Sequence, residues 1–144
     1  MALYLASFDV SGDIEAMFDY IADFSNTAHW DPSVSRGIRL DPGALGLESR
    51  FEIDVAFLGT TTTMTYEVTR FERPNLVILD SKTPFVDSHD EITLTPCGGG
   101  VRVTYTARLT LPGLLQLADP ALQLAFNPSG NRSRDGLIEA LERL

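Results

Sequence analysis

The first quarter of the chain combines a strand pattern with a helical one. Residues 2–10 favour a strand, and Ser11 or Asp13 can cap a helix that follows it. The apolar positions of that helix recur at helical spacing, namely Ile14, Met17, Phe18 and Ile21. The "SNT" at 25–27 can cap a second, shorter helix, and Pro32 ends helical structure. We therefore expect one strand followed by two short helices.

From about residue 34 to residue 110 the apolar positions alternate with polar ones, and Gly- and Pro-rich turn signals separate the runs. This predicts six further strands. Alternation places on one face Phe51, Ile53, Val55 and Phe57 of one strand, Met64, Tyr66 and Val68 of the next, and Val101, Val103, Tyr105, Ala107 and Leu109 of the last. The residues between them suit solvent, so the sheet has one wet face. The short apolar strand at 77–80 has no predicted orientation.

After Pro112 the pattern returns to helix and continues to the end of the chain. Its apolar positions are Leu114, Leu117, Ala118, Ala121, Leu122, Ala125 and Phe126, and then Leu137, Ile138, Leu141 and Leu144. We expect a bend near Pro120 and a kink or break near Pro128, because each proline removes a backbone donor. The order of elements predicts a single α+β domain over residues 1–144, in which an antiparallel sheet wraps a long C-terminal helix.

Size and charge narrow the classes of partner. A chain of 144 residues is long enough to form one hydrophobic core without disulfide bonds or bound metals. No apolar run approaches the roughly 18 residues of a membrane span. The N-terminus has no basic region before its apolar residues, so we expect a first strand and not a signal peptide, and hence a cytoplasmic protein. The net charge of −9 opposes binding to nucleic acid or anionic membranes.

Several stretches, taken with this order of elements, resemble the START-like or helix-grip (SRPBCC) superfamily, and within it the polyketide cyclase/dehydrase and lipid-transport group. They cover nearly the whole chain and read "IEAMFDYIADFSNTAHWDPSV", "GLESRFEIDVAFLG", "TYEVTRFERPNLVIL", "TLTPCGGGVRVTYTARL" and "GLIEALERL". The resemblance implies a seven-stranded antiparallel sheet curved around a long C-terminal helix, with two short helices after the first strand. It also implies a cavity between sheet and helix for an apolar or aromatic small molecule.

Mapping the alternation onto that fold predicts which residues contact the ligand. On the sheet side these are Phe51, Ile53, Val55, Phe57, Met64, Tyr66, Val68, Val103 and Tyr105, and on the helix side Leu114, Leu117, Leu122 and Phe126, with Trp30 closing one end. Any one aliphatic residue of this set can instead belong to the packed core. Tyr66 and Tyr105 are stronger candidates, because a buried phenol needs a hydrogen-bond partner that a ligand can supply.

Candidate chemistry is limited by the presence of only two histidines, His29 and His89. His29 stands beside Trp30 and Asp31 at the expected mouth of the cavity, so it is a candidate for proton transfer along with Tyr66 and Tyr105. If Ile92 and Leu94 face the core, His89 faces solvent, although a bulge would turn Asp87 and His89 inward.

Other classes of site have little support in the sequence. The single cysteine, Cys97, sits in the apparent turn "TPCGGG" and permits no intrachain disulfide. The closest approach to a metal-ligand cluster is Asp87, His89 and Glu91 on one strand face, and no nucleotide-binding loop or nucleophile elbow is present. We expect neither a metal nor a cofactor.

Three functions stay open. The first is a carrier of a hydrophobic small molecule, such as a lipid, a polyketide or an aromatic compound. The second is a polyketide cyclase/dehydratase-like enzyme in which His29 or a cavity tyrosine moves protons. The third is a protein-interaction module of the kind found among relatives that bind coenzyme Q or ribosomes. For each, the expected assembly is a monomer or a homodimer.

Overall fold

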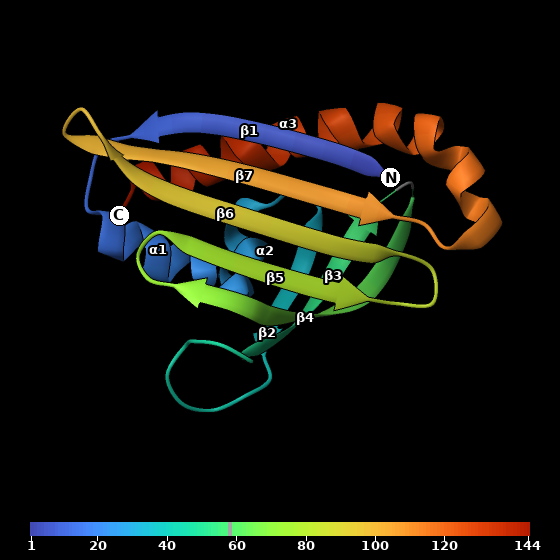
Figure 1. The fold of residues 1–144 in the computed structure, drawn as a ribbon, viewed down its shortest axis with the longest axis horizontal. Coiled ribbons are helices and arrows are strands. Elements are labelled where there is room, and N and C mark those ends of the chain that lie inside the picture. The colour runs from blue at the N-terminus through green and yellow to red at the C-terminus, as the bar shows by residue number, and fades with distance from the viewer. Residues whose placement is uncertain (58) are drawn as a thin grey trace.

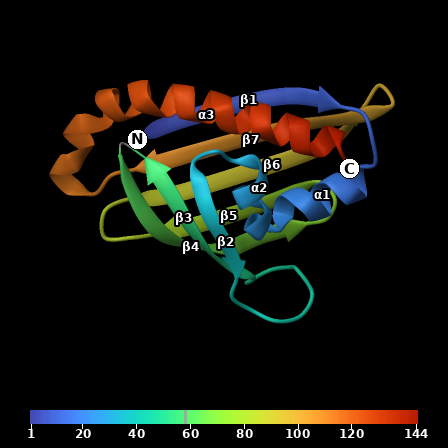
Figure 2. The ribbon, with the colours of Figure 1, turned by 180° about the vertical axis from the view of Figure 1, so that it is seen from behind.

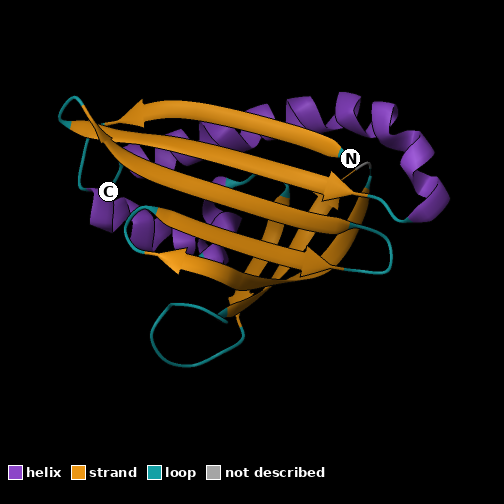
Figure 3. Cartoon of the chain, in the orientation of Figure 1, coloured by secondary structure: helices purple, strands orange, loops and turns teal. Residues whose placement is uncertain are grey.

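One curved antiparallel sheet forms most of the molecule (Figures 1 and 3). The computed structural model describes residues 1–57 and 59–144. In this part of the chain seven strands follow the order β1-β7-β6-β5-β4-β3-β2. Their bounds are β1 Ala2–Val10, β2 Val34–Arg39, β3 Arg50–Phe57, β4 Thr60–Glu72, β5 Leu76–Lys82, β6 Asp87–Cys97 and β7 Gly100–Thr110. The chain thus has the helix-grip fold, as the sequence predicts.

All the helices lie on the concave side of this sheet (Figure 2). They are α1 (Ile14–Ala22), the 3₁₀ helix η1 (Phe24–Asn26), the one-turn α2 (Thr27–Trp30), the 3₁₀ helix η2 (Gly113–Ala118) and the long α3 (Asp119–Glu142). The Asp13 side chain caps α1 by accepting a hydrogen bond from the Ala16 backbone N–H at 2.9 Å. Helix α3 runs along β1 and across α2, so it closes the open side of the sheet.

Helix α3 differs in two ways from what the sequence predicts. It is continuous through Pro128, so it has no break there. Its first half, which includes Pro120 and Pro128, bends without interruption of the helix, and a bend near Pro120 was expected (Figure 1). Pro128 removes the hydrogen bond to the carbonyl of Leu124, but both residues are exposed and water can reach that carbonyl. The second difference is that residues 113–118 form a 3₁₀ helix. Side chains three apart then lie in line, and Leu114 and Leu117 both face solvent.

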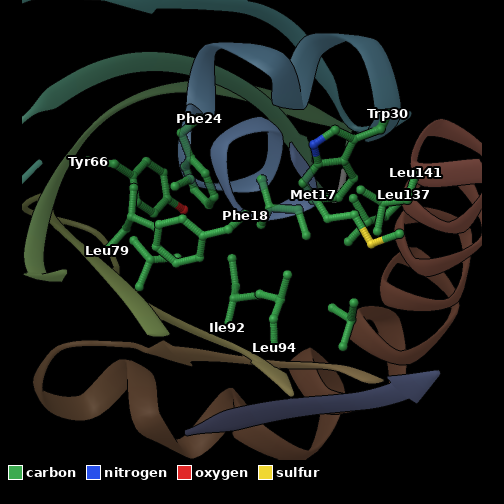
Figure 4. Close-up of a cluster of buried hydrophobic side chains, with 14 of the residues drawn as sticks. Met17, Phe18, Phe24, Trp30, Tyr66, Leu79, Ile92, Leu94, Leu137 and Leu141 are labelled. Carbon is green, nitrogen blue, oxygen red and sulfur yellow. The ribbon is translucent and has the colours of Figure 1, made fainter. Parts of the chain in front are cut away.

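The concave face is tightly packed at one end. There α1 and the second half of α3 meet the inward residues of the sheet, and the side chains are at most 1% exposed: Met17, Phe18, Ile21, Val68, Val77, Leu79, Ile92, Leu94, Val103, Leu137 and Leu141 (Figure 4). Val77 and Leu79 settle the orientation of the strand that the sequence left open, since both point inward. The other end of the same face is hollow.

Candidate functional site

A cavity of about 430 Å³ lies between the sheet and α3, beyond the packed end. This volume is within the range of small-molecule pockets in proteins, roughly 300–1,000 Å³. Its wall is mostly apolar and comes from every layer of the fold, including β1, β3, β4, β6, β7, the short helices and α3. The cavity therefore has the place and character that the resemblance implies.

Nine of the predicted ligand contacts lie in this wall: Trp30, Ile53, Val55, Phe57, Met64, Tyr66, Tyr105, Leu122 and Phe126. Five predicted contacts do not. Phe51, Val68 and Val103 point to the correct face but belong to the packed end, because alternation determines the face of a residue and not its position along the strand. Leu117, with Leu114, is exposed on η2.

Four polar side chains from three strands meet at the inner end of the cavity, where it borders the packed core. The Tyr66 hydroxyl donates to Ser88 Oγ at 2.9 Å, and Ser88 Oγ donates to Asp90 Oδ1 at 3.0 Å. From the other side, the Tyr105 hydroxyl donates to Asp90 Oδ2 at 2.5 Å. Every hydroxyl proton of this network is thus directed toward Asp90, whose side chain is buried.

The Asp90 carboxyl is the group in this network that can exchange a proton near neutral pH. Burial raises its pKa to about 6, although the hydrogen bonds from Tyr105 and Ser88 work in the opposite direction. Burial and the nearby Asp90 carboxylate raise the pKa of the Tyr66 and Tyr105 phenols far above the usual range. The two phenols therefore remain hydrogen-bond donors, whereas the Asp90 carboxyl can be either protonated or ionised near neutral pH.

Trp30 stands in the wall at the same end. Its ring makes an edge contact with Tyr105, with centroids 6.1 Å apart. In Figure 4 its indole nitrogen is turned to the side of Phe24 and Tyr66 and away from Leu137. This buried Nε1–H has no hydrogen-bond partner among the described residues. A buried donor without an acceptor is unfavourable, which makes it a position where a ligand oxygen would be stabilised.

Asp31, the residue after Trp30, joins the short helices to α3. Its Oδ1 accepts hydrogen bonds from the backbone N–H of Ser33 at 2.9 Å, from Ser33 Oγ at 2.7 Å and from Ser133 Oγ of α3 at 2.8 Å. Asp31 also lines the cavity. It adds a second carboxylate to the inner wall, and this negative charge contributes to the raised pKa of Asp90.

The two histidines lie outside the cavity. His29 is exposed, contrary to the expectation that it meets the cavity contents. The reason is geometric, because Thr27 and Trp30, one turn apart in α2, face inward and leave His29 on the outer side. His89 faces outward on β6, and its Nδ1 pairs with the Asp80 carboxylate.

Asp90 and Ser88 are the site residues that the sequence interpretation missed. The signal was present, because both have the same parity as Ile92 and Leu94, whose inward orientation was considered. Following that alternation two residues further places a carboxyl group and a hydroxyl group on the buried face. The pattern of a single strand cannot show that Tyr66 and Tyr105, from two other strands, contact Ser88 and Asp90.

The described residues 1–57 and 59–144 contain neither a metal-ligand cluster nor a helix that could span a membrane. In this part of the chain, no three His, Cys, Asp or Glu side chains come together as a set of metal ligands. Over the same residues, none of the helices combines the length and apolar character needed to cross a membrane.

Comparison with known proteins agrees with this geometry. The family described as polyketide cyclase / dehydrase and lipid transport matches residues 1–142. The chain belongs to this family. No curated protein sequence matches the chain. Membership of the polyketide cyclase / dehydrase and lipid-transport family agrees with the fold and with the cavity between its curved sheet and C-terminal helix.

Three solved structures with the same fold have sequences distant from this one. TTHA0849 from Thermus thermophilus is 16% identical, with a TM-score of 0.79 and 96% of each chain covered. A START superfamily protein from Mycobacterium smegmatis is 14% identical, with a TM-score of 0.79 and coverage of 98% of this chain and 97% of that one. The Zhui aromatase/cyclase from Streptomyces sp. R1128 is 14% identical, with a TM-score of 0.73 and coverage of 98% and 93%. At these identities the likeness establishes the fold.

Proposed function

We propose that this protein binds a hydrophobic small molecule, such as a lipid, a polyketide or an aromatic compound, in the cavity between the sheet and α3. The observation that carries the proposal is the cavity itself, about 430 Å³ in volume and lined mostly by apolar side chains. An apolar molecule that enters it leaves water, and each Å² of apolar surface removed contributes about 25 cal/mol. A cytoplasmic location and a monomeric or homodimeric state remain part of the proposal.

Filling the cavity is the direct test. Ala107 lines it from β7, so in Ala107→Phe the new ring occupies space that a ligand would use. We expect native mass spectrometry to show a bound apolar compound in the purified wild type and not in this variant. In equilibrium dialysis naphthalene should bind the wild type, with at least about tenfold loss of affinity in the variant.

A matched control places the same substitution away from the cavity. Ala56 is exposed on β3, so Ala56→Phe should bind naphthalene as the wild type does. Circular dichroism would verify that both variants are folded. Equal binding by Ala107→Phe and wild type would show that the ligand lies elsewhere and would refute the proposal.

The network around Asp90 favours a second function, proton transfer of the polyketide cyclase/dehydratase kind. A carboxylate with a pKa of about 6 in an apolar cavity can remove a proton from an activated methylene group and later return one to an oxygen. The raised phenol pKa values suit Tyr66 and Tyr105 for donating hydrogen bonds to a carbonyl oxygen and not for acting as bases. Asp90 thus replaces His29 as the candidate base.

For this second function we expect Asp90→Asn to lower turnover of a poly-β-ketoacyl thioester analogue by about a hundredfold. Naphthalene binding should persist in the variant, since the apolar wall is unchanged. His29→Ala, which alters an exposed side chain, should leave turnover unchanged. Full activity of Asp90→Asn would exclude Asp90 as the base, and no activity in the wild type would leave the carrier function alone.

A further inference from the structure

At the inner end of the cavity, the groups that can still accept a hydrogen bond outnumber those that can still donate one. Tyr66, Ser88 and Tyr105 all direct their hydroxyl protons along the chain that ends on Asp90. What these groups still offer a ligand is lone pairs, on the phenol oxygens and on the carboxylate. The free donor at this end, among the described residues, is the indole N–H of Trp30.

We propose that this inner end, formed by Trp30, Tyr66, Ser88, Asp90 and Tyr105, selects an uncharged ligand that carries a hydroxyl group, and that Asp90 discriminates against anions. The proposal rests on the proposed binding function and adds the chemistry of the polar group. A hydroxyl group is both donor and acceptor. It can accept from Trp30 Nε1–H while it donates to the Asp90 carboxylate or to a phenol oxygen.

An anionic group would meet the opposite situation. A carboxylate or sulfonate only accepts, and it would face the Asp90 carboxylate, with Asp31 also in the wall. Binding would then require Asp90 to take up a proton. Because burial already raises the pKa of Asp90 to about 6, anion binding should weaken about tenfold for each pH unit above that value.

The Asp90→Asn variant separates the effect of Asp90 from those of the other charged and titratable groups nearby, because any pH dependence that they cause would remain in it. The phenols of Tyr66 and Tyr105 stay protonated, since burial raises the pKa of each. His89 lies on the outer face of β6 and pairs with Asp80. Arg134 lines the cavity from α3, but its side chain is 38% exposed and its guanidinium is ion-paired with Asp135 at 2.9 Å. It can attract an anion equally at all the pH values used.

Three probes of similar size separate these effects by equilibrium dialysis. Naphthalene reports the apolar cavity, naphthol adds a hydroxyl group, and naphthalene sulfonate adds a permanent negative charge. With the wild type we expect naphthol to bind about tenfold more tightly than naphthalene at pH 7. Sulfonate binding should weaken about a hundredfold between about pH 5 and about pH 8, while naphthalene binding stays constant.

Two variants assign these effects to residues. In Asp90→Asn the pH dependence of sulfonate binding should disappear, and in Trp30→Phe naphthol should lose most of its advantage over naphthalene. Naphthol binding no better than naphthalene, or a pH dependence retained in Asp90→Asn, would overturn the inference while naphthalene binding still supported the proposed function. Failure of all three probes to bind would overturn both.

Discussion

Asp90→Asn should make the protein more stable at about pH 8, and the gain should decline steadily as the pH falls toward about 4. The folded-state pKa of Asp90 is about 6, against 3.8 for an unperturbed aspartate. The folded protein therefore binds the proton more tightly than the unfolded chain. The stability that comes from protonated Asp90 is fully present below the unfolded value and is lost as the pH rises through about 6.

The size of the effect follows from the two pKa values. Each pKa unit of difference corresponds to about 1.4 kcal/mol, so ionised Asp90 costs about 3 kcal/mol of unfolding free energy at pH 8. About half of this should return by pH 5. Urea denaturation of both proteins at a series of pH values measures it. The quantity of interest is how the difference between their unfolding free energies changes with pH, because lost hydrogen bonds at the new amide add a constant to that difference.

Asp87→Asn is the matched control, since Asp87 is exposed on the same strand. Its difference from the wild type should be nearly the same at all these pH values. A constant difference for Asp90→Asn as well would mean that Asp90 is solvated and already ionised at pH 5 in the folded protein. That result would also remove the basis of its proposed roles in proton transfer and in excluding anions.

Gly136→Ala should destabilise the protein by about 3 kcal/mol, although alanine is the better helix former by about 1 kcal/mol. Helix α3 lies so close to α2 at this point that a Cβ on Gly136 would be 1.9 Å from the backbone oxygen of Trp30. Backbone oxygen cannot move aside as a flexible side chain can. Helix α3 would have to move away from α2, which would disturb the Ser133–Asp31 hydrogen bond and the burial of Leu137.

Gly46→Ala provides the comparison, because a Cβ on Gly46 has no described atom within 4 Å and the backbone there is not left-handed. Its unfolding free energy should stay within about 0.5 kcal/mol of the wild type. Gly136→Ala should also weaken naphthalene binding, since Trp30 and Leu137 both line the cavity. An unchanged or higher stability for Gly136→Ala would show that α3 and α2 are further apart than the structure places them.

Much of the fold could be predicted from local pattern. Period-two alternation identified the inward face of β3, β4 and β7, and helical spacing identified the buried side of α1. These predictions succeed because the backbone geometry of a single element decides which side chains share a face. The same rule fails where the local helix type changes, as it does for Leu117 in the 3₁₀ turn before α3.

The cavity could be expected from the resemblance, but its limits could not. Phe51 and Ile53 lie on the same face of β3 and both have apolar side chains, yet Phe51 belongs to the packed core and Ile53 lines the cavity. The difference depends on how far α1 and η1 reach along the concave face, which no alternation pattern contains. The sequence also drew attention to His29, Trp30 and Asp31; in the structure Trp30 and Asp31 line the cavity, whereas His29 is exposed.

What the sequence by itself determined is the order of elements, the apolar face of β3, β4 and β7, and a net charge of −9. The polar site was decided only by tertiary structure. Its residues come from three strands, with Tyr66 on β4, Ser88 and Asp90 on β6, and Tyr105 on β7. They meet because β4 and β7 curve toward each other around α3. The raised pKa of Asp90 is a consequence of that closure, because burial has no meaning for a residue until the rest of the chain surrounds it.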